Sequence, residues 1–287
     1  MKTQFYRLLD SGFGSKLEQV GDVRIIRPAP QATWILRLPD SEWKKADAEY
    51  DYDKGTWSFA NPDLPREWTV KIGEISMIMK FAAGGQIGMF PEHIDNQDLF
   101  QAIANHQKEH ERPFRLLNLF AYTGAATLQA ASLGAEVVHV DSAKSSVNWA
   151  KANAVASGLS EKPIRWIVDD VRKFVQREKV RGSRYDGILL DPPSFGRGSN
   201  GEIWKIEADL LPFMKTLMSL MGESFSYMKL STHTQGMLQD EVKGLLKGIT
   251  AHSPIPGNVR CFDLANVEES GRGIFLDCGS CAVFMIK

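Results

Sequence analysis

From Asp95 onward the chain alternates helix-length segments with short apolar runs, and this alternation constrains the fold more than any other feature of the sequence. The segments follow in this order: helix "IDNQDLFQAIANHQKEH", strand "RLLNLFA", helix "GAATLQAASLG", strand "EVVHVD", helix "AKSSVNWAKANAVASG", strand "IRWIVDD", helix "VRKFVQREKV" and strand "YDGILLD". Such alternation predicts right-handed crossovers and a parallel sheet with helices on both faces. We therefore expect an α/β fold of the Rossmann type.

The remainder of this region continues the pattern and then changes it. A helix near "ADLLPFMKTLMSLM" comes before the strand "SFSYMKLS", and a helix near "MLQDEVKGLLKGI" follows. The last two apolar segments, "VRCFDLANVEES" and "GIFLDCGSCAVFMIK", flank Gly271 and Gly273. Glycines between two strand-like runs are typical of a turn, so we expect a terminal hairpin.

The first 90 residues have a different character. They contain short alternating runs rich in aromatic and β-branched residues, separated by Pro, Gly and Asp: "VRIIRP", "TWILRL", "TWSFA", "EWTVKI" and "ISMIMKFAA". This period-two pattern predicts antiparallel strands. We expect a small β-rich domain over residues 1–90 and the α/β domain over residues 91–287.

Composition narrows the class of protein. The chain has 287 residues, 43% of them hydrophobic, a formal net charge of -1 and three cysteines. An odd, small number of cysteines fits a reducing compartment, and we find neither a membrane-spanning run nor a secretory signal, so a cytoplasmic location is expected. The near-neutral charge lacks the basic excess of many nucleic-acid-binding proteins, so any such function must depend on local patches.

Acidic residues follow four successive strands. In an open α/β sheet, ligands bind at the carboxyl ends of the strands, where the strand order reverses. The first strand leads to Gly124, and the next three end at Asp141, at Asp169 with Asp170, and at Asp191. Each acid alone has a simpler role as a helix cap or turn former. Together, and with Asp141 seventeen residues after Gly124, they predict a carboxylate that accepts hydrogen bonds from ribose hydroxyls.

The first turn indicates which nucleoside is bound. It reads "AYTGAATLQAASLG" and lacks the G-x-G-x-x-G arrangement that lets a backbone approach a pyrophosphate. This disfavours a nicotinamide dinucleotide. A cofactor with a ribose but no phosphate tolerates a turn with fewer glycines, and S-adenosyl-L-methionine is such a molecule.

These residues resemble a known family. "LNLFAYTGAATLQAASLGAEVVHVDSAKSSVNWAKANA", "VDDV" and "DPPSF" occur in the order found in class I S-adenosylmethionine-dependent methyltransferases, in particular the bacterial large-subunit (23S) ribosomal RNA methyltransferase group. The resemblance covers roughly residues 75–287. It implies a Rossmann-like methyltransferase sheet, S-adenosyl-L-methionine as cofactor and ribosomal RNA as partner.

The resemblance also implies roles for individual residues. The backbone from Ala121 to Gly124 would hold the methionine part, Asp141 the ribose, and Asp170 with Val171 the adenine. "IGMFPEH" resembles a segment "GxFxDQR" that closes the cofactor site, although Glu92 replaces the usual Asp and Ile94 stands where Arg is common. The complete set of implied cofactor-binding residues is Phe90, Pro91, Asn118, Phe120, Ala121, Tyr122, Thr123, Gly124, Asp141, Ser142, Asp170, Val171 and Asp191.

The segment "DPPSF" supplies the predicted catalytic residues Asp191, Pro192, Pro193 and Phe195. Both prolines fix φ and have no N–H, so we expect a stiff corner whose carbonyl acceptors are uncontested by local donors. Such a corner can hold a planar nitrogenous group. By resemblance, it lies beside the methyl group of the cofactor, and Phe195 stacks on a base extruded from RNA.

The cysteines and histidines bear on the target atom. Carbon-5 methylation of a pyrimidine needs a thiolate, yet "LSTHTQGM" has no cysteine, and Cys261, Cys278 and Cys281 lie in the terminal strands. We therefore expect a nitrogen target. The "CGSC" pair has no second pair and the histidines lack ligand spacing, so no metal is expected; His233 lies near the predicted substrate mouth.

Other interpretations stay open at this point. Arg181, Arg197 and Lys205 are candidates for phosphate contacts, with solvated charge as the simpler explanation. The same cofactor could serve methylation of a protein side-chain amide or of a small molecule. The chain could also be a non-catalytic assembly factor that binds the cofactor or RNA.

Overall fold

The computed structural model describes residues 5–198, 201–234, 236–251 and 256–286. The chain forms two compact units. Unit 1 comprises Met1–Ile94 and Ala265–Cys278, and unit 2 comprises Asp95–Leu264 and Gly279–Lys287. These units are groups of residues that pack together, whereas the predicted bounds 1–90 and 91–287 concern domains that fold independently. The domain bounds therefore stay a prediction.

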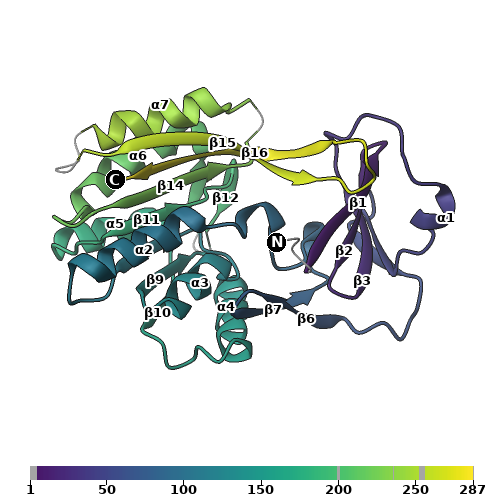
Figure 1. The fold of residues 1–287 in the computed structure, drawn as a ribbon, viewed down its shortest axis with the longest axis horizontal. Coiled ribbons are helices and arrows are strands. Elements are labelled where there is room, and N and C mark those ends of the chain that lie inside the picture. Colours follow the sequence, from purple (N-terminus) through teal and green to yellow (C-terminus); the bar gives the residue numbers. More distant parts are fainter. Residues whose placement is uncertain (1–4, 199–200, 235, 252–255, 287) are drawn as a thin grey trace. The chain divides into compact units, whose positions relative to one another are not determined.

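The framework of unit 2 is a seven-stranded sheet in the order β10-β9-β8-β11-β14-β16-β15 (Figure 1). Its strands are β8 (Arg115–Leu119), β9 (Glu136–Asp141), β10 (Ile164–Val168), β11 (Gly187–Leu190), β14 (Tyr227–Thr232), β15 (Asn258–Val267) and β16 (Phe275–Met285). The strands from β10 to β14 are mutually parallel. The predicted α/β class with a Rossmann-like sheet is confirmed.

The sheet is mostly parallel, with an antiparallel pairing near its edge. β16 pairs with β14 in antiparallel orientation, with Tyr227 opposite Met285 and Thr232 opposite Ser280. β16 lies between β14 and β15. The two terminal strands therefore extend the edge beyond β14, in the part of the sequence where the alternation of strand and helix stops.

Helices cover both faces of this sheet. Their bounds are α2 (Gln97–Glu109), α3 (Ala125–Ser132), α4 (Lys144–Ala156), α5 (Val171–Val180), α6 (Ile206–Leu217) and α7 (Gln239–Thr250). On one face, Leu117, Ile188 and Met228 of neighbouring strands pack in one buried cluster with side chains of α5, α6 and α7. The alternate residues of the same strands point to the opposite face, where α3 bonds to Asn118.

A short antiparallel ribbon interrupts this pattern after β11. It consists of β12 (Phe195–Arg197) and β13 (Ile203–Lys205) and leads directly into α6. The sequence analysis did not predict this ribbon. Three residues per strand are too few for a recognisable period.

Unit 1 contains a five-stranded sheet in the order β1-β2-β3-β4-β5 and a separate pair β6-β7. The strands of unit 1 are β1 (Tyr6–Gly12), β2 (Ser15–Val20), β3 (Val23–Pro28), β4 (Ala48–Asp51), β5 (Thr56–Phe59), β6 (Glu67–Ile72) and β7 (Ile75–Lys80). Its short helices are α1 (Asp40–Trp43), η1 (Ala83–Gly85) and η2 (Pro91–His93). Another short helix, η3 (Met218–Leu220), belongs to unit 2. The β-rich character is confirmed. One pairing, β3 with β4, is parallel and departs from the predicted antiparallel arrangement.

The predicted strand "TWILRL" is absent from unit 1. Residues 33–38 form an irregular segment instead. The backbone N–H groups of Arg37 and Leu38 donate to the buried Asp10 carboxylate, at 3.1 Å and 2.8 Å to Oδ2. A side-chain acceptor therefore satisfies donors that a neighbouring strand would otherwise bond, so the alternating pattern here did not produce a strand.

In the part of the chain that the structure describes, every helix is too short or too polar to cross a bilayer.

Candidate active site

The site lies where the strand order of the unit 2 sheet reverses. β8 has β9 on one side and β11 on the other, so the crossovers that follow β8 and β11 leave in opposite directions. The carboxyl ends of these parallel strands open a crevice in sheets of this kind. Leu119 and Leu190 are register partners, so the turn after β8 and the corner at Asp191 start from the same level of the sheet.

The turn after β8 has an unusual backbone. Phe120 and Tyr122 have φ values of 55° and 49°, and Gly124 has a φ of 86°. Left-handed conformations at non-glycine residues cost about 1–2 kcal/mol each and often occur at functional sites. The Tyr122 N–H is used internally, since it donates to Asp141 Oδ2 at 2.9 Å.

This turn ends at the beginning of α3. Gly124 precedes the helix without a side-chain cap, and the first intrahelical bond runs from Leu128 N to Gly124 O at 2.9 Å. The N–H groups of the first turn of a helix have no intrahelical acceptor and attract negative charge. The beginning of α3 is therefore suited to a carboxylate or another electron-rich group.

Asp141 is held from two sides by backbone donors. Its Oδ2 accepts from Tyr122 N and its Oδ1 accepts from Ala143 N at 2.8 Å. Burial raises the pKa of Asp141, while the two N–H groups oppose this rise. Since each carboxylate oxygen has two lone pairs, both oxygens keep the capacity to accept a hydroxyl, as a ribose diol requires.

Three buried polar side chains next to the turn are linked by hydrogen bonds. Asn118 Nδ2 donates to Thr127 Oγ1 at 2.9 Å, and the Thr127 hydroxyl lies 2.9 Å from His139 Nδ1. The Thr127 hydroxyl and the His139 ring nitrogen are hydrogen-bonded whichever of the two atoms donates. Burial lowers the pKa of His139 to about 3, so the ring is neutral. Neither Thr127 nor His139 was among the predicted site residues.

Asp170 has the capping role that the sequence analysis gave as its simpler explanation. Its Oδ1 accepts from Arg172 N at 2.9 Å and Lys173 N at 3.2 Å, and its Oδ2 accepts from the Arg172 guanidinium at 3.0 Å. Burial raises the pKa of Asp170, but the Arg172 guanidinium and these amides outweigh it and lower the pKa overall. The Val171 side chain is buried. As the first residue of α5, Val171 has an N–H without an intrahelical acceptor.

The corner after β11 is fixed through its carboxylate. The Ser231 hydroxyl of β14 donates to Asp191 Oδ1 at 2.7 Å, and His233 Nε2 lies 3.8 Å from Asp191 Oδ2. Pro192 is buried and Pro193 is exposed. Ser231 was not among the predicted site residues because its contact depends on strand pairing, which the sequence does not display.

The expectation of uncontested carbonyls is wrong at Pro193. The indole Nε1 of Trp204 donates to the Pro193 carbonyl at 2.8 Å, so the ribbon occupies that acceptor. The next carbonyl, that of Ser194, accepts from Ile206 N at 3.0 Å. Among the described residues, none donates to the carbonyl of Pro192. The corner therefore presents two acceptors, the Asp191 carboxylate, which also accepts from Ser231, and the Pro192 carbonyl.

Phe195 is 51% exposed at the start of β12. A large exposed aromatic ring directly after a fixed corner is available for stacking. The other predicted residues of the first turn face inward. The Phe120 ring packs at 5.0 Å from that of Trp204, and the Thr123 carbonyl accepts from Asn153 Nδ2 at 2.9 Å. Ala121 is buried, and Ser142 is half-buried directly after β9.

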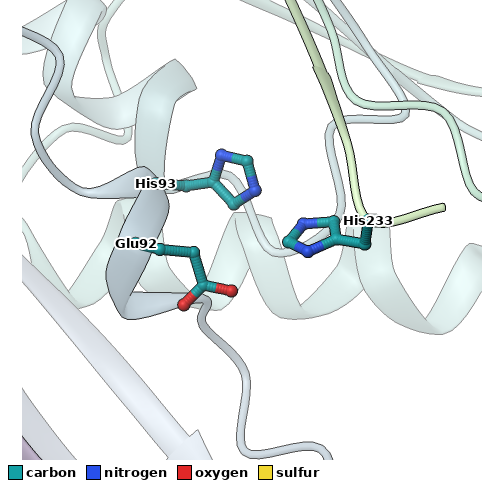
Figure 2. A group of neighbouring side chains, drawn as sticks. All are labelled: Glu92, His93 and His233. Atoms are coloured by element: carbon teal, nitrogen blue, oxygen red, sulfur yellow. The ribbon is translucent and has the colours of Figure 1, made fainter. Parts of the chain in front are cut away.

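The remaining predicted residues lie in unit 1: Phe90 directly precedes η2 and Pro91 is its first residue. Their role in cofactor binding stays a prediction. In Figure 2, Glu92 and His93 project from η2, whereas His233 belongs to the segment after β14 in unit 2. Within unit 1, Glu92 Oε2 accepts from Asn266 Nδ2 at 3.1 Å, and the His93 ring lies edge-on to Phe90. These contacts account for each side chain within its own unit, and we propose no metal site from them.

The strand order, the left-handed turn before α3 and the acid after the second strand define the class of protein. They are the features of a Rossmann-like α/β protein that binds a nucleoside at the carboxyl edge of its sheet.

Comparison with known proteins gives the family. The crystal structure of the S-adenosylmethionine-dependent methyltransferase from Agrobacterium tumefaciens matches with a TM-score of 0.90 and 35% identity, covering 99% of this chain and 91% of that one. The chain therefore belongs to the S-adenosylmethionine-dependent methyltransferases. A family model described as "Conserved hypothetical protein 95" matches residues 96–212.

Curated relatives match a shorter region. Ribosomal RNA large subunit methyltransferase K/L of Syntrophotalea carbinolica is 36% identical over 151 residues, which is 52% of this chain and 20% of that protein. Ribosomal RNA large subunit methyltransferase I of Aeromonas salmonicida is 31% identical over 122 residues, which is 42% of this chain and 29% of that protein. The chain thus spans less than a third of the length of these relatives.

Proposed function

We propose that this protein is an S-adenosyl-L-methionine-dependent methyltransferase that methylates a base nitrogen of ribosomal RNA. The observation that carries the proposal is the pair of acceptors at the corner after β11. The Asp191 carboxylate is fixed by Ser231, and the neighbouring Pro192 carbonyl has no donor among the described residues. The names of the curated relatives support RNA as the substrate class.

The donors and acceptors at the edge of the sheet fit the cofactor. Asp141 retains lone pairs for the two ribose hydroxyls, and the beginning of α3 suits the carboxylate of the methionine part. The Val171 N–H is a donor for a ring nitrogen of adenine. Asp170 is already bonded to three donors of its own helix, so we assign it to positioning Val171.

The corner is suited to an exocyclic amine. When bound, the cofactor supplies a methyl group activated by a positively charged sulfur. An amine carries two N–H donors, and Asp191 and Pro192 present two acceptors for them. Accepting both hydrogens orients the nitrogen lone pair away from the corner, toward the methyl group, so the contribution of the corner is alignment.

The reaction also releases a proton. With the cofactor bound, the nitrogen lone pair would form the new N–C bond as the S–C bond breaks, and the electron pair of that bond would stay on sulfur. The methylated nitrogen then loses a proton, for which the Asp191 carboxylate is the adjacent acceptor. Phe195 would hold the base by stacking, because its ring is exposed beside the corner. A cytoplasmic location belongs to the same proposal.

Transfer of a labelled methyl group tests the proposal. Purified protein is incubated with labelled S-adenosyl-L-methionine and, separately, with total RNA, protein and metabolite fractions from cells that lack it. Label is expected in large-subunit ribosomal RNA, in an N-methylated nucleotide that mass spectrometry identifies. Label in protein or metabolites with none in RNA would instead establish an amide or small-molecule substrate, and binding of the cofactor without any transfer would establish an assembly factor.

A further inference from the structure

One face of the ribbon β12–β13 combines apolar and cationic side chains. Phe195 is the register partner of Lys205, and Arg197 is the partner of Ile203. Directly opposed residues of an antiparallel pair project to the same face. These four side chains are all exposed, whereas Trp204, which points the other way, is buried and bonded to the Pro193 carbonyl. The ribbon is therefore anchored on one face and open on the other.

The two cations of this open face differ from those of the neighbouring helix α5. Arg172, Lys173 and Arg177 form ion pairs with Asp170, Glu202 and Asp169 respectively. Within the described ranges, neither Arg197 nor Lys205 forms an ion pair. The charges of these three side chains of α5 are paired within the protein, and those of the ribbon remain available to a polyanion.

The apolar members of the face have no packing role of their own. Phe195 is 51% and Ile203 49% exposed, and the guanidinium of Arg197 lies 5.8 Å from the centre of the Phe195 ring. Exposed rings with interspersed cations bind single-stranded nucleic acid, because bases stack on the rings and phosphates pair with the cations. An acidic peptide would use the cations but gains little from a ring at this spacing.

We propose that the open face of the ribbon, where Arg197, Ile203 and Lys205 lie beside Phe195, binds the single-stranded RNA that flanks the target base. This inference rests on the proposed function. It adds that the sugar–phosphate backbone of the RNA lies along the ribbon. Arg197 and Lys205 hold phosphates next to the target nucleotide, and they deliver the base to the corner at Asp191. The near-neutral charge of the whole chain is then compatible with an RNA substrate, since the contact depends on two uncompensated charges.

The double variant Arg197→Gln/Lys205→Gln tests the inference with the full-length protein. Its matched control is Lys162→Gln/Lys179→Gln, which removes the same charge from exposed positions outside the ribbon. Both are assayed for methyl transfer to the RNA fraction that the wild-type protein labels, at several salt concentrations. Cofactor affinity is measured by calorimetry in each variant to confirm that the fold and the cofactor site are intact.

The ribbon variant is expected to raise KM for RNA about tenfold and to leave kcat at saturating RNA unchanged. Its log KM should depend less steeply on log salt, by about 1.4, since each contact to a single strand contributes about 0.7. The control should match the wild type. An unchanged KM and salt slope in the ribbon variant would overturn the inference while the proposed function stands. If the wild-type protein labels no RNA, both the proposed function and the inference fail.

Discussion

The hydroxyl of Ser231 on β14 lies 2.7 Å from the carboxylate of Asp191, which directly follows the neighbouring strand β11. Ser231 is buried in β14 and directly follows Leu230, which pairs with Leu190 of β11. The pairing of the two strands therefore sets the position of Ser231. A rigid donor on one strand therefore fixes the carboxylate at the end of the next. This contact determines the direction of the Asp191 oxygens more firmly than the two prolines alone.

Removing this donor should reduce turnover without affecting the cofactor. Ser231→Ala is expected to lower kcat for methyl transfer about tenfold, because a hydrogen bond to a charged group contributes roughly 1.5–3 kcal/mol. Asp191→Ala should lower it at least ~100-fold. Cofactor affinity of Ser231→Ala, measured by calorimetry, should stay constant. Ser132→Ala, which removes a hydroxyl bonded within α3, is the control; equal effects of the two serine variants would contradict the role of Ser231.

Asp141 should determine cofactor affinity. In Asp141→Asn, the amide nitrogen must face a backbone N–H, because both carboxylate oxygens now accept from Tyr122 and Ala143. The variant also loses the charge that strengthens bonds to ribose hydroxyls. We expect the Kd for S-adenosyl-L-methionine to rise about 10- to 100-fold, which corresponds to one or two charge-assisted hydrogen bonds.

The control for this prediction is Asp169→Asn. Asp169 also follows a strand of the edge, but its carboxylate pairs with Arg177 on the adjacent helix. Its cofactor affinity should match the wild type. If Asp141→Asn binds as tightly as Asp169→Asn, Asp141 serves only the turn and the ribose assignment is wrong.

The parts of the fold that follow from the sequence are those where one periodicity extends over many residues. The helices and strands from α2 to β11 were predicted because apolar spacing changes with each element and the crossover rule then fixes the topology. The segment at residues 33–38 has the same local pattern as a strand, yet Asp10 binds its backbone donors. Long-range side-chain acceptors leave no trace in local periodicity.

The site shows the same division. Asp141 and Asp191 were found because parallel strands bring their ends together, whatever the side-chain details. The occupied carbonyl of Pro193 was missed since its donor, Trp204, comes from a ribbon of three-residue strands. Ser231 and Thr127 were missed because hydroxyl contacts depend on register and packing. The sequence therefore predicts which strand ends meet, and only the structure shows which of their polar groups are already bonded.

Gly124 is expected to resist substitution for two separable reasons. A Cβ at this position would lie 3.1 Å from Ala150 Cβ, and its φ of 86° is strained for any other residue. Gly124→Ala should lower the free energy of unfolding by at least ~1–2 kcal/mol and weaken cofactor binding. Gly158 has a comparable φ of 66°, and a Cβ added there would have no atom within 4 Å. Gly158→Ala therefore measures the backbone strain without the steric contact. Urea unfolding of both variants measures the difference, and equal losses would show that crowding against Ala150 is unimportant.

His139 should make stability fall at mildly acidic pH. Burial lowers its pKa from 6.5 to about 3 in the folded state, so between these values the unfolded chain binds more protons. Stability then rises with pH, and the contribution is fully present above pH 6.5 and lost as the pH falls toward 3. From pH 6.5 to 5.5, the free energy of unfolding should fall about 1 kcal/mol further in the wild type than in His139→Gln.

Urea unfolding of the wild type and of His139→Gln at several pH values checks this prediction. Parallel profiles of wild type and His139→Gln would show that His139 is not held neutral in the folded protein.

Replacing all three cysteines should preserve methyl transfer. Burial raises the pKa of Cys278 and of Cys281 to about 12, so neither thiol supplies the thiolate that attack on a pyrimidine carbon requires. The variant Cys261→Ala/Cys278→Ala/Cys281→Ala is expected to retain kcat, although the fully buried Cys281 makes some loss of stability expected. Transfer is therefore assayed well below the midpoint of thermal unfolding, alongside cofactor binding. Loss of transfer with intact cofactor binding would assign a thiol to the reaction and move the target from nitrogen to carbon.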